Sequence, residues 1–169
     1  MKIRVECASL ADLKCDLLVV DQFEGVKKPG GAAGVADKAL KGLISKLMHD
    51  GELSGKIGKT TVIHCHGRMK ADKVVVVGLG KREKFDLEAV RTAAAAAIKM
   101  AREAKAKTVA TIIQGAGIGG LDPEEAAKAV VEGSVLGVYQ FSGYAKEKEE
   151  PDFKIDRHFL VECDKEKMR

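Results

Sequence analysis

Two glycine turns are the stretches of this sequence whose residues are best suited to hold a ligand. Gly115, Gly117 and Gly120 form a G-x-G-x-x-G pattern after an apolar run, which is typical of a turn that binds dinucleotide phosphates. In a dinucleotide fold, however, this turn belongs to the first βα unit and its helix begins inside the motif. Here it follows about the fifth expected strand, and the acidic residue expected roughly 20 positions later is missing. The pattern favours a strand-to-helix loop, and contact with a phosphate is the alternative.

The second glycine turn, residues 77–83 (VGLGKRE), places Lys81 and Arg82 directly after Gly80. Basic side chains beside a glycine turn can hold an anion, but they can equally pair with acidic groups. The turn lacks the four-residue spacer and the Gly-Lys-Ser/Thr ending of a phosphate-binding loop. A ligand role is therefore the less favoured interpretation of this turn.

The run His64-Cys65-His66 is the one cluster that resembles part of a metal site. On a strand the two histidines share one face and Cys65 points to the other. Two imidazoles supply half of a zinc site, but no other pattern of ligands completes it. We interpret the pair as histidines at a strand end. His49 and His158 are isolated, and we expect them at a helix end and on a strand surface.

Nucleophilic catalysis finds no support, because the sequence has no G-x-S-x-G elbow and no local grouping of Ser, Cys and His residues. The acidic pairs fall at an expected helix start and in a polar segment, where they serve the helix dipole and solubility. We therefore assign no catalytic, cofactor-binding or metal-binding residue to this chain.

Length and composition favour one soluble globular domain. The 169 residues are 46% hydrophobic and 32% charged, which is an ordinary balance for a packed core. No apolar run is long enough to cross a membrane, so we expect a cytoplasmic protein. The four cysteines are scattered and fit free thiols better than disulfides. The net charge of +4 arises from 29 basic and 25 acidic residues, which gives nucleic-acid binding only weak support.

Alternating and β-branched runs predict six strands, and 3.6-residue periodicity predicts three helices. The strands are expected at residues 3–7, 16–21, 60–66, 73–77, 108–113 and 155–163. The helices are expected at 35–49, from Asp86 to about 101, and from Asp122 to about 141. Asp86 and Asp122 are the expected N-caps of the last two helices, and Gly51 is the expected C-cap of the first.

This order of elements predicts an α/β fold, a three-layer α/β/α sandwich with a mixed sheet. The sheet is mixed because residues 60–66 and 73–77 are close enough to form a hairpin, while the helices act as crossovers between parallel strands. Residues 146–151 (KEKEEP) are interpreted as a polar linker before the last strand.

Three stretches together carry a resemblance to a known family. They are VVVVGLGKRE at 74–83, LDPEEAA at 121–127 and EGSVLGVYQFSGY at 132–144. With residues 16–20 and 55–58 (GKIG), they resemble the N-terminal domain of the leucyl aminopeptidase (cytosol aminopeptidase) family, over essentially the whole chain. That domain resembles the macro-domain fold, in agreement with the order of elements.

The resemblance implies a longer enzyme that releases N-terminal residues from peptides, with two divalent ions (Zn or Mn) in a C-terminal catalytic domain and a homohexameric assembly. The family's metal motif, N-T-D-A-E-G-R-L, has no counterpart here, so no catalytic or metal residue is carried over. We expect residues 1–145 to form the macro-like domain and 146–169 to supply a linker, the last strand and the start of a connector. The alternative is a free-standing module that binds ADP-ribose or a related nucleotide, with the glycine loop at 115–120 facing its phosphates.

Overall fold

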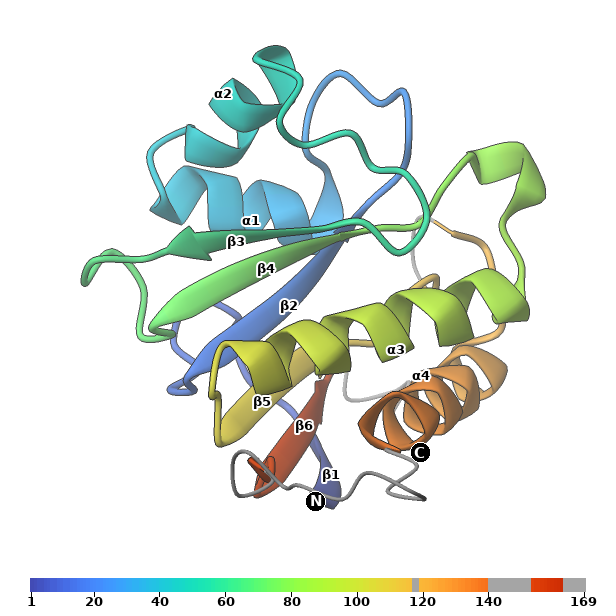
Figure 1. Cartoon of the computed structure of the whole chain (residues 1–169). Coiled ribbons are helices and arrows are strands. Elements are labelled where there is room, and N and C mark those ends of the chain that lie inside the picture. The colour runs from blue at the N-terminus through green and yellow to red at the C-terminus, as the bar shows by residue number, and fades with distance from the viewer. Residues whose placement is uncertain (117–118, 140–152, 163–169) are drawn as a thin grey trace, which may run out of the picture.

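The computed structural model describes residues 1–116, 119–139 and 153–162. Within these ranges, six strands form one sheet in the order β1-β6-β5-β2-β4-β3, covered by helices on both faces (Figure 1). The strands are β1 (Lys2–Glu6), β2 (Leu17–Gln22), β3 (Thr60–His64), β4 (Lys73–Gly78), β5 (Thr108–Ile112) and β6 (Arg157–Val161). The helices are α1 (Gly31–Ala39), α2 (Leu43–His49), α3 (Leu87–Glu103) and α4 (Pro123–Val138), with a 3₁₀ turn, η1 (Arg82–Lys84).

The sheet is mixed, as the sequence predicts. β3 and β4 pair antiparallel as a hairpin, and the other neighbouring pairs are parallel. Because parallel strands run in one direction, the carboxyl ends of β2, β4 and β5 meet at the same edge of the sheet.

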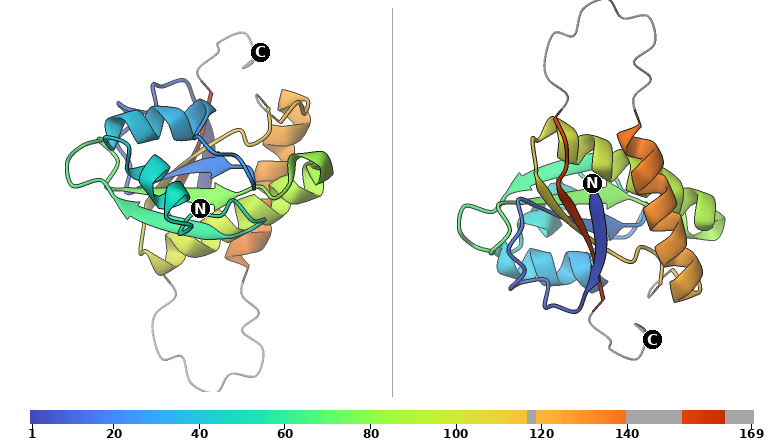
Figure 2. Two further views of the ribbon diagram at one scale, coloured as in Figure 1. Left: turned by 90° about the horizontal axis from the view of Figure 1, so that it is seen from above. Right: turned by 90° about the horizontal axis from the view of Figure 1, so that it is seen from below.

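The two central strands are apolar on both faces, which places them in the middle of three layers. On β2, Leu18 and Val20 belong to the core that also contains buried residues of α1 and α2. Leu17 and Val19 belong to the core on the side of α3. The three-layer α/β/α sandwich is thus confirmed, with α1 and α2 on one face and α3 and α4 on the other (Figure 2).

The prediction of one helix over residues 35–49 is wrong: the segment forms two helices, and the first begins earlier, at Gly31. The break lies at Lys41 and Gly42, whose φ angles are 59° and 83°. This left-handed conformation cannot continue an α-helix, and glycine adopts it readily. The apolar spacing carries across the break, which is why periodicity alone suggested a continuous helix.

The predicted N-caps of the last two helices are confirmed. The Asp86 carboxylate accepts a hydrogen bond from the Ala89 N–H at 2.8 Å. The Asp122 carboxylate accepts from the N–H groups of Glu124 and Glu125, both at 3.0 Å. Gly51 follows the end of α2 with φ of 77°, in keeping with its predicted role at the C-terminus of that helix.

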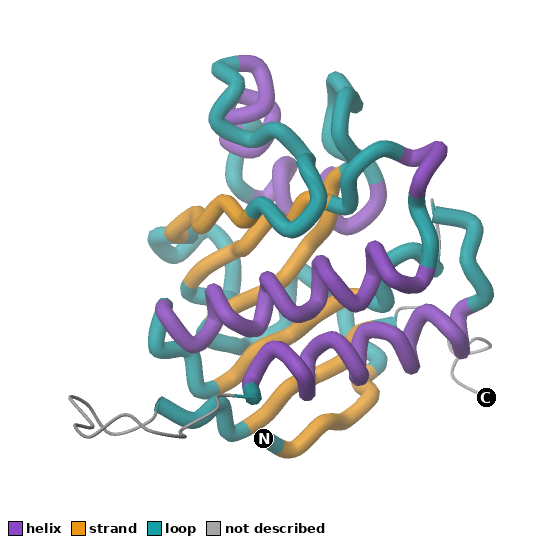
Figure 3. Tube along the Cα trace, turned by 45° about the vertical axis from the view of Figure 1, so that its right-hand side comes forward, coloured by secondary structure: helices purple, strands orange, loops and turns teal. Residues whose placement is uncertain are grey.

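Helices α3 and α4 lie side by side over the sheet (Figure 3). Their closeness follows from small residues: the alanine run of α3 faces the backbone of α4 at Gly133 and Gly137. A Cβ atom on Gly137 would lie 2.8 Å from the Ala95 Cα, and one on Gly133 would overlap the Arg91 carbonyl oxygen. The alanine run therefore packs against a second helix as well as against the predicted sheet.

The strands at the two chain ends are neighbours, because β1 lies at one edge of the sheet and β6 separates it from β5. Figure 2 shows these two strands running alongside each other. The expected linker at 146–151 lies outside the described residues. The last helix ends at Val138, before the expected end near 141, because the backbone of Tyr139 is extended. The last strand ends at Val161, before the expected 163.

Candidate functional site

The connections of the sheet create one natural place for a ligand, between the carboxyl ends of β2 and β5. From β2 the chain passes through α1 and α2 on one face, whereas from β5 it passes through α4 on the opposite face. Adjacent strands whose connections leave in opposite directions open a crevice between them. Ligands of open α/β sheets commonly bind at such a switch point.

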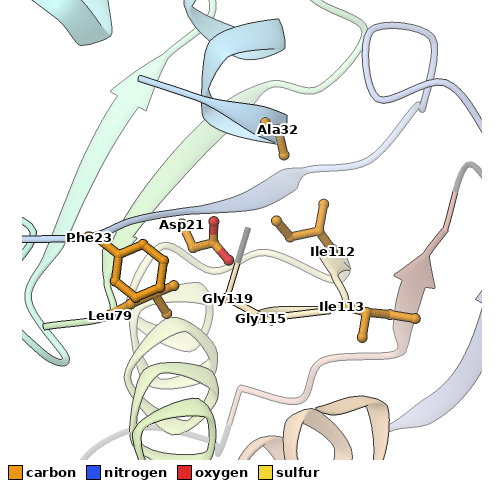
Figure 4. A pocket seen from close by; sticks show the side chains of 9 residues that line it. Asp21, Phe23, Ala32, Leu79, Ile112, Ile113, Gly115 and Gly119 are labelled. Atoms are coloured by element: carbon orange, nitrogen blue, oxygen red, sulfur yellow. The ribbon is translucent and has the colours of Figure 1, made fainter. Parts of the chain in front are cut away.

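A cavity of about 120 Å³ lies at this place (Figure 4). The end of β2 contributes Asp21 and Phe23, and the start of α1 contributes Gly31 and Ala32. Leu79 follows β4, Ile112 ends β5, and the segment after β5 contributes Ile113, Gly115 and Gly119. Its walls are mainly apolar, and Asp21 is the acidic side chain among the described residues that line it.

The Asp21 carboxyl group points into the space between Ala32, Ile112 and Gly119 (Figure 4). The residue is partly buried, and burial raises the pKa of its carboxyl from 3.8 to about 7. A hydrogen bond within Asp21 itself partly offsets this effect, and no charged neighbour contributes to the pKa. The cavity therefore holds an acid that is poised to gain or lose a proton near neutral pH.

The start of α1 also borders this cavity. Its N-cap, Gly30, provides no side-chain hydrogen bond, and the first turn contains no acidic residue. The N–H groups of a first helical turn have no partner within the helix and carry the positive end of its dipole. Gly31 and Ala32, which line the cavity, belong to this turn.

The glycine loop after β5 is shaped by packing against Phe85. Gly115 has φ of 86°, and a Cβ atom on it would lie 2.7 Å from the Phe85 ring. A Cβ atom on Gly119 would meet the same ring at 2.6 Å. As predicted, α4 begins at Pro123, after the last glycine. Gly115 and Gly119 line the cavity, Gly117 lies outside the described residues, and the helix that opens onto the cavity is α1.

The second glycine turn reaches the same cavity through Leu79 and not through its basic residues. Lys81 and Arg82 are exposed, and the Arg82 guanidinium lies 5.0 Å from the centre of the Phe23 ring. This is the geometry of a cation–π contact, so Arg82 covers one of the residues that form the wall.

The histidines are not part of this site. His64 and His66 are exposed, with ring centres 5.9 Å apart, and Cys65 is buried on the other side. His49 is exposed at the end of α2, as expected. The expectation for His158 is wrong: it is fully buried, and its Nε2 lies 2.8 Å from the Thr111 hydroxyl. Its neighbours in the sheet, Ile3 and Val109, belong to the cores beneath α3 and α4, so the ring lies on a face that these helices cover.

A metal centre finds no ligand set in the described part of the chain, where no three or more His, Cys, Asp or Glu residues gather closely enough to hold an ion. Two divalent ions need several converging carboxylates, so these residues do not fit such a group. None of the helices that the structure describes combines the length and apolar composition needed to cross a membrane.

The sequence comparison decides the family. Residues 19–148 match the profile described as cytosol aminopeptidase family, N-terminal domain. The chain belongs to this family. A probable cytosol aminopeptidase from Alkaliphilus metalliredigens is 36% identical over 153 residues, which are 89% of this chain and 30% of that protein. The chain thus spans about 30% of the length of this curated relative, as its N-terminal domain.

Solved structures support the fold of this cytosol aminopeptidase domain. A variant of tomato leucine aminopeptidase is similar with a TM-score of 0.76 and 19% identity, over 97% of this chain and 33% of that one. A Trypanosoma brucei macrodomain in complex with ADP-ribose is similar with a TM-score of 0.72 and 14% identity, over 98% of this chain and 66% of that one. The macro-like fold is therefore confirmed.

Sequence analysis assigns no ligand role to Asp21, the acidic residue of this cavity, and places it only at the end of a buried strand. The available signal was an acidic residue directly after four apolar ones, at the end of a central strand where ligands of α/β sheets bind.

Proposed function

We propose that this chain is the non-catalytic N-terminal domain of a two-metal aminopeptidase, with an assembly or regulatory role beside a C-terminal catalytic domain. The match to the N-terminal domain of the family carries this proposal. The absence of a metal ligand cluster among the described residues supports it. For the full-length protein we also propose two Zn or Mn ions in the catalytic domain, assembly as a homohexamer and a cytoplasmic location.

Residues 146–169 are proposed to lead into the catalytic domain, after a macro-like body at 1–145. The second segment also contributes β6, which is hydrogen-bonded between β1 and β5. For expression of the domain alone, both segments are therefore needed to complete the sheet.

The test is an activity assay on the purified 169-residue chain with Mn²⁺ or Zn²⁺ and a leucine chromogenic substrate. We expect no metal-dependent hydrolysis, whereas a full-length member of the family assayed in parallel hydrolyses the substrate. Turnover by the 169-residue chain that chelation abolishes and added metal restores would refute the proposal.

A second candidate function is binding of ADP-ribose or a related nucleotide. The observation in its favour is the position of Gly115 and Gly119 at the cavity, opposite the first turn of α1. The volume of about 120 Å³ argues against it, because sites for larger ligands measure roughly 300–1,000 Å³. Calorimetry with millimolar ADP-ribose tests this function, and absence of heat would rule it out.

Nucleic-acid binding is the weakest candidate, because the charges of this chain nearly balance. It predicts binding that weakens steeply with salt. Absent or salt-insensitive binding to a DNA duplex would exclude it.

A further inference from the structure

We propose that the cavity between β2 and β5 binds a compact aliphatic primary amine, whose ammonium group pairs with the Asp21 carboxylate. This inference stands on the cavity alone and holds whether or not the domain belongs to a peptidase. It names a ligand of a size and charge different from those of a nucleotide.

The charge of the ligand follows from Asp21. Its carboxyl group faces the cavity (Figure 4), and no ion pair to another described residue satisfies it. A carboxylate in apolar surroundings is stabilised strongly by a cation that donates hydrogen bonds to it. A primary ammonium group offers three such donors and remains compact. An anionic ligand would meet a repulsive group here at any pH at which Asp21 is ionised.

The size and polarity of the ligand follow from the walls. Leu79, Ile112 and Phe23 present apolar side chains around the acid. A cavity of about 150 Å³ lined by such residues accepts a molecule as large as benzene. The volume of about 120 Å³ therefore suits a branched alkyl group of a few carbon atoms.

Three kinds of molecule could supply such an amine, and they differ in the chemical group attached next to the ammonium group. The same chemistry occurs in a simple alkylamine, a free aliphatic amino acid and the N-terminus of a peptide. Gly31 and Ala32, in the first turn of α1, line the cavity wall, and the N–H groups of such a turn have no partner within the helix. A carboxylate on the ligand would gain from these donors, whereas an amide or an alkyl group would gain less.

The experiment is calorimetry on the 169-residue chain at pH 7.5 with isoamylamine, leucine, leucinamide and 4-methylpentanoate as four separate ligands. We expect the three amines to bind and 4-methylpentanoate, which lacks the amine, not to bind. Tighter binding of leucine than of the other two would assign the site to free amino acids. Equal binding of leucine and leucinamide, with isoamylamine weaker, would assign it to peptide N-termini, and equal binding of all three would assign it to alkylamines.

Two variants and one control test the geometry. Asp21→Asn removes the charge and should weaken amine binding by about tenfold or more, since bonds to charged groups are worth at least this factor. Ala32→Met fills the cavity from a helical position and should abolish binding of all amines. Asp12→Asn removes a carboxylate that is exposed and paired with Lys70, and it should leave the affinity unchanged.

A proton balance distinguishes this site from a nonspecific acidic surface. Because burial raises the pKa of Asp21 to about 7, an ammonium ion that pairs with it should displace a fraction of a proton at pH 7. The heat of binding should then vary with the ionisation enthalpy of the buffer, and Asp21→Asn should remove this variation. The remaining described residues that line the cavity carry no titratable side chain.

Three results would overturn the proposal. The first is no amine binding at 20 mM ligand, well above an affinity of about 1 mM. The second is amine binding that Asp21→Asn leaves unchanged while circular dichroism shows a folded variant. The third is binding of 4-methylpentanoate that strengthens as the pH falls, which would mean that protonated Asp21 selects an acid.

Discussion

His158 should contribute a pH-dependent part to the stability of this domain, and a single substitution should remove that contribution. The ring is fully buried on β6, its Nδ1 has no hydrogen-bond partner, and burial lowers its pKa from 6.5 to about 4. In the unfolded chain the ring takes up a proton below about pH 6.5. In the folded chain it does so only near pH 4. Acid therefore favours the unfolded state, and stability is lost as the pH falls from about 6.5 to about 4.

The magnitude follows from the gap between the two pKa values. A gap of about 2.5 pH units, at 1.36 kcal/mol per unit, is about 3 kcal/mol of unfolding free energy. This is a large part of the 5–15 kcal/mol that a domain usually has.

Asp21 opposes this trend over almost the same range. Its folded pKa of about 7 lies above the ordinary 3.8, so the stability that it contributes is present below about pH 3.8 and lost as the pH rises to about 7. The effect is at most about 4 kcal/mol, and less to the extent that solvent reaches this partly exposed residue. The contributions of the two groups should therefore largely cancel in the unmodified chain.

The assay is urea unfolding of the unmodified chain and of His158→Gln between pH 4 and pH 7.5, followed by circular dichroism because the chain contains no Trp. Between pH 7 and pH 4, the variant should gain about 3 kcal/mol relative to the unmodified chain. Asp21→Asn should shift in the opposite direction. His49→Gln is the matched control, because its side chain is 89% exposed.

The reasoning would be refuted if the difference in unfolding free energy between His158→Gln and the unmodified chain stayed constant within about 0.5 kcal/mol from pH 7 to pH 4. A constant offset would mean that the substitution changes packing alone and that the buried ring does not titrate differently in the two states.

Three further outcomes can be measured on the same protein. Gly133→Ala should lower the unfolding free energy by about 1–3 kcal/mol in urea titrations, because the added methyl group would overlap the backbone of α3. An unchanged urea midpoint would contradict the close approach of the two helices. Asp122→Ala should cost about 1 kcal/mol, with Asp122→Asn as the control that keeps an acceptor, and equal loss in both would argue against the cap. In a background with Cys65→Ser and Cys163→Ser, two thiols remain. Cys7, which is exposed, should react at once with Ellman's reagent, whereas burial raises the pKa of the Cys15 thiol to about 12 and should delay its reaction until unfolding. Two fast thiols would contradict this burial.

Much of the fold could be predicted because local signals agreed with the global arrangement. The run of four apolar residues before Asp21 predicted a strand buried on both faces, and Asp122-Pro123 predicted a helix start. The break at Gly42 could not be predicted from periodicity, because the apolar stripe continues across it with the same spacing. The positive φ angles of Lys41 and Gly42 change the helix direction without changing the pattern of side chains.

The candidate site was harder to predict, because its residues come from separate segments that only the order of strands in the sheet brings together. Gly115 and Leu79 belong to the two glycine turns that sequence analysis singled out, yet their shared cavity depends on β5 and β4 flanking β2. Which strands become neighbours is decided by long-range packing. The burial of His158 could not be predicted for the same reason, since it depends on α3 and α4 packing over that face of β6.

The pairing of β1 with β6 has a consequence for how this domain is made. Lys2 lies opposite Arg157 in the sheet, so β1 must wait during synthesis for nearly the whole domain before its partner strand appears. Synthesis proceeds at roughly 5–20 residues per second, which leaves that strand unpaired for several seconds or more. Its charged side chains, Lys2, Arg4 and Glu6, reduce the risk of association during this interval, because charges on a strand discourage its pairing with another chain.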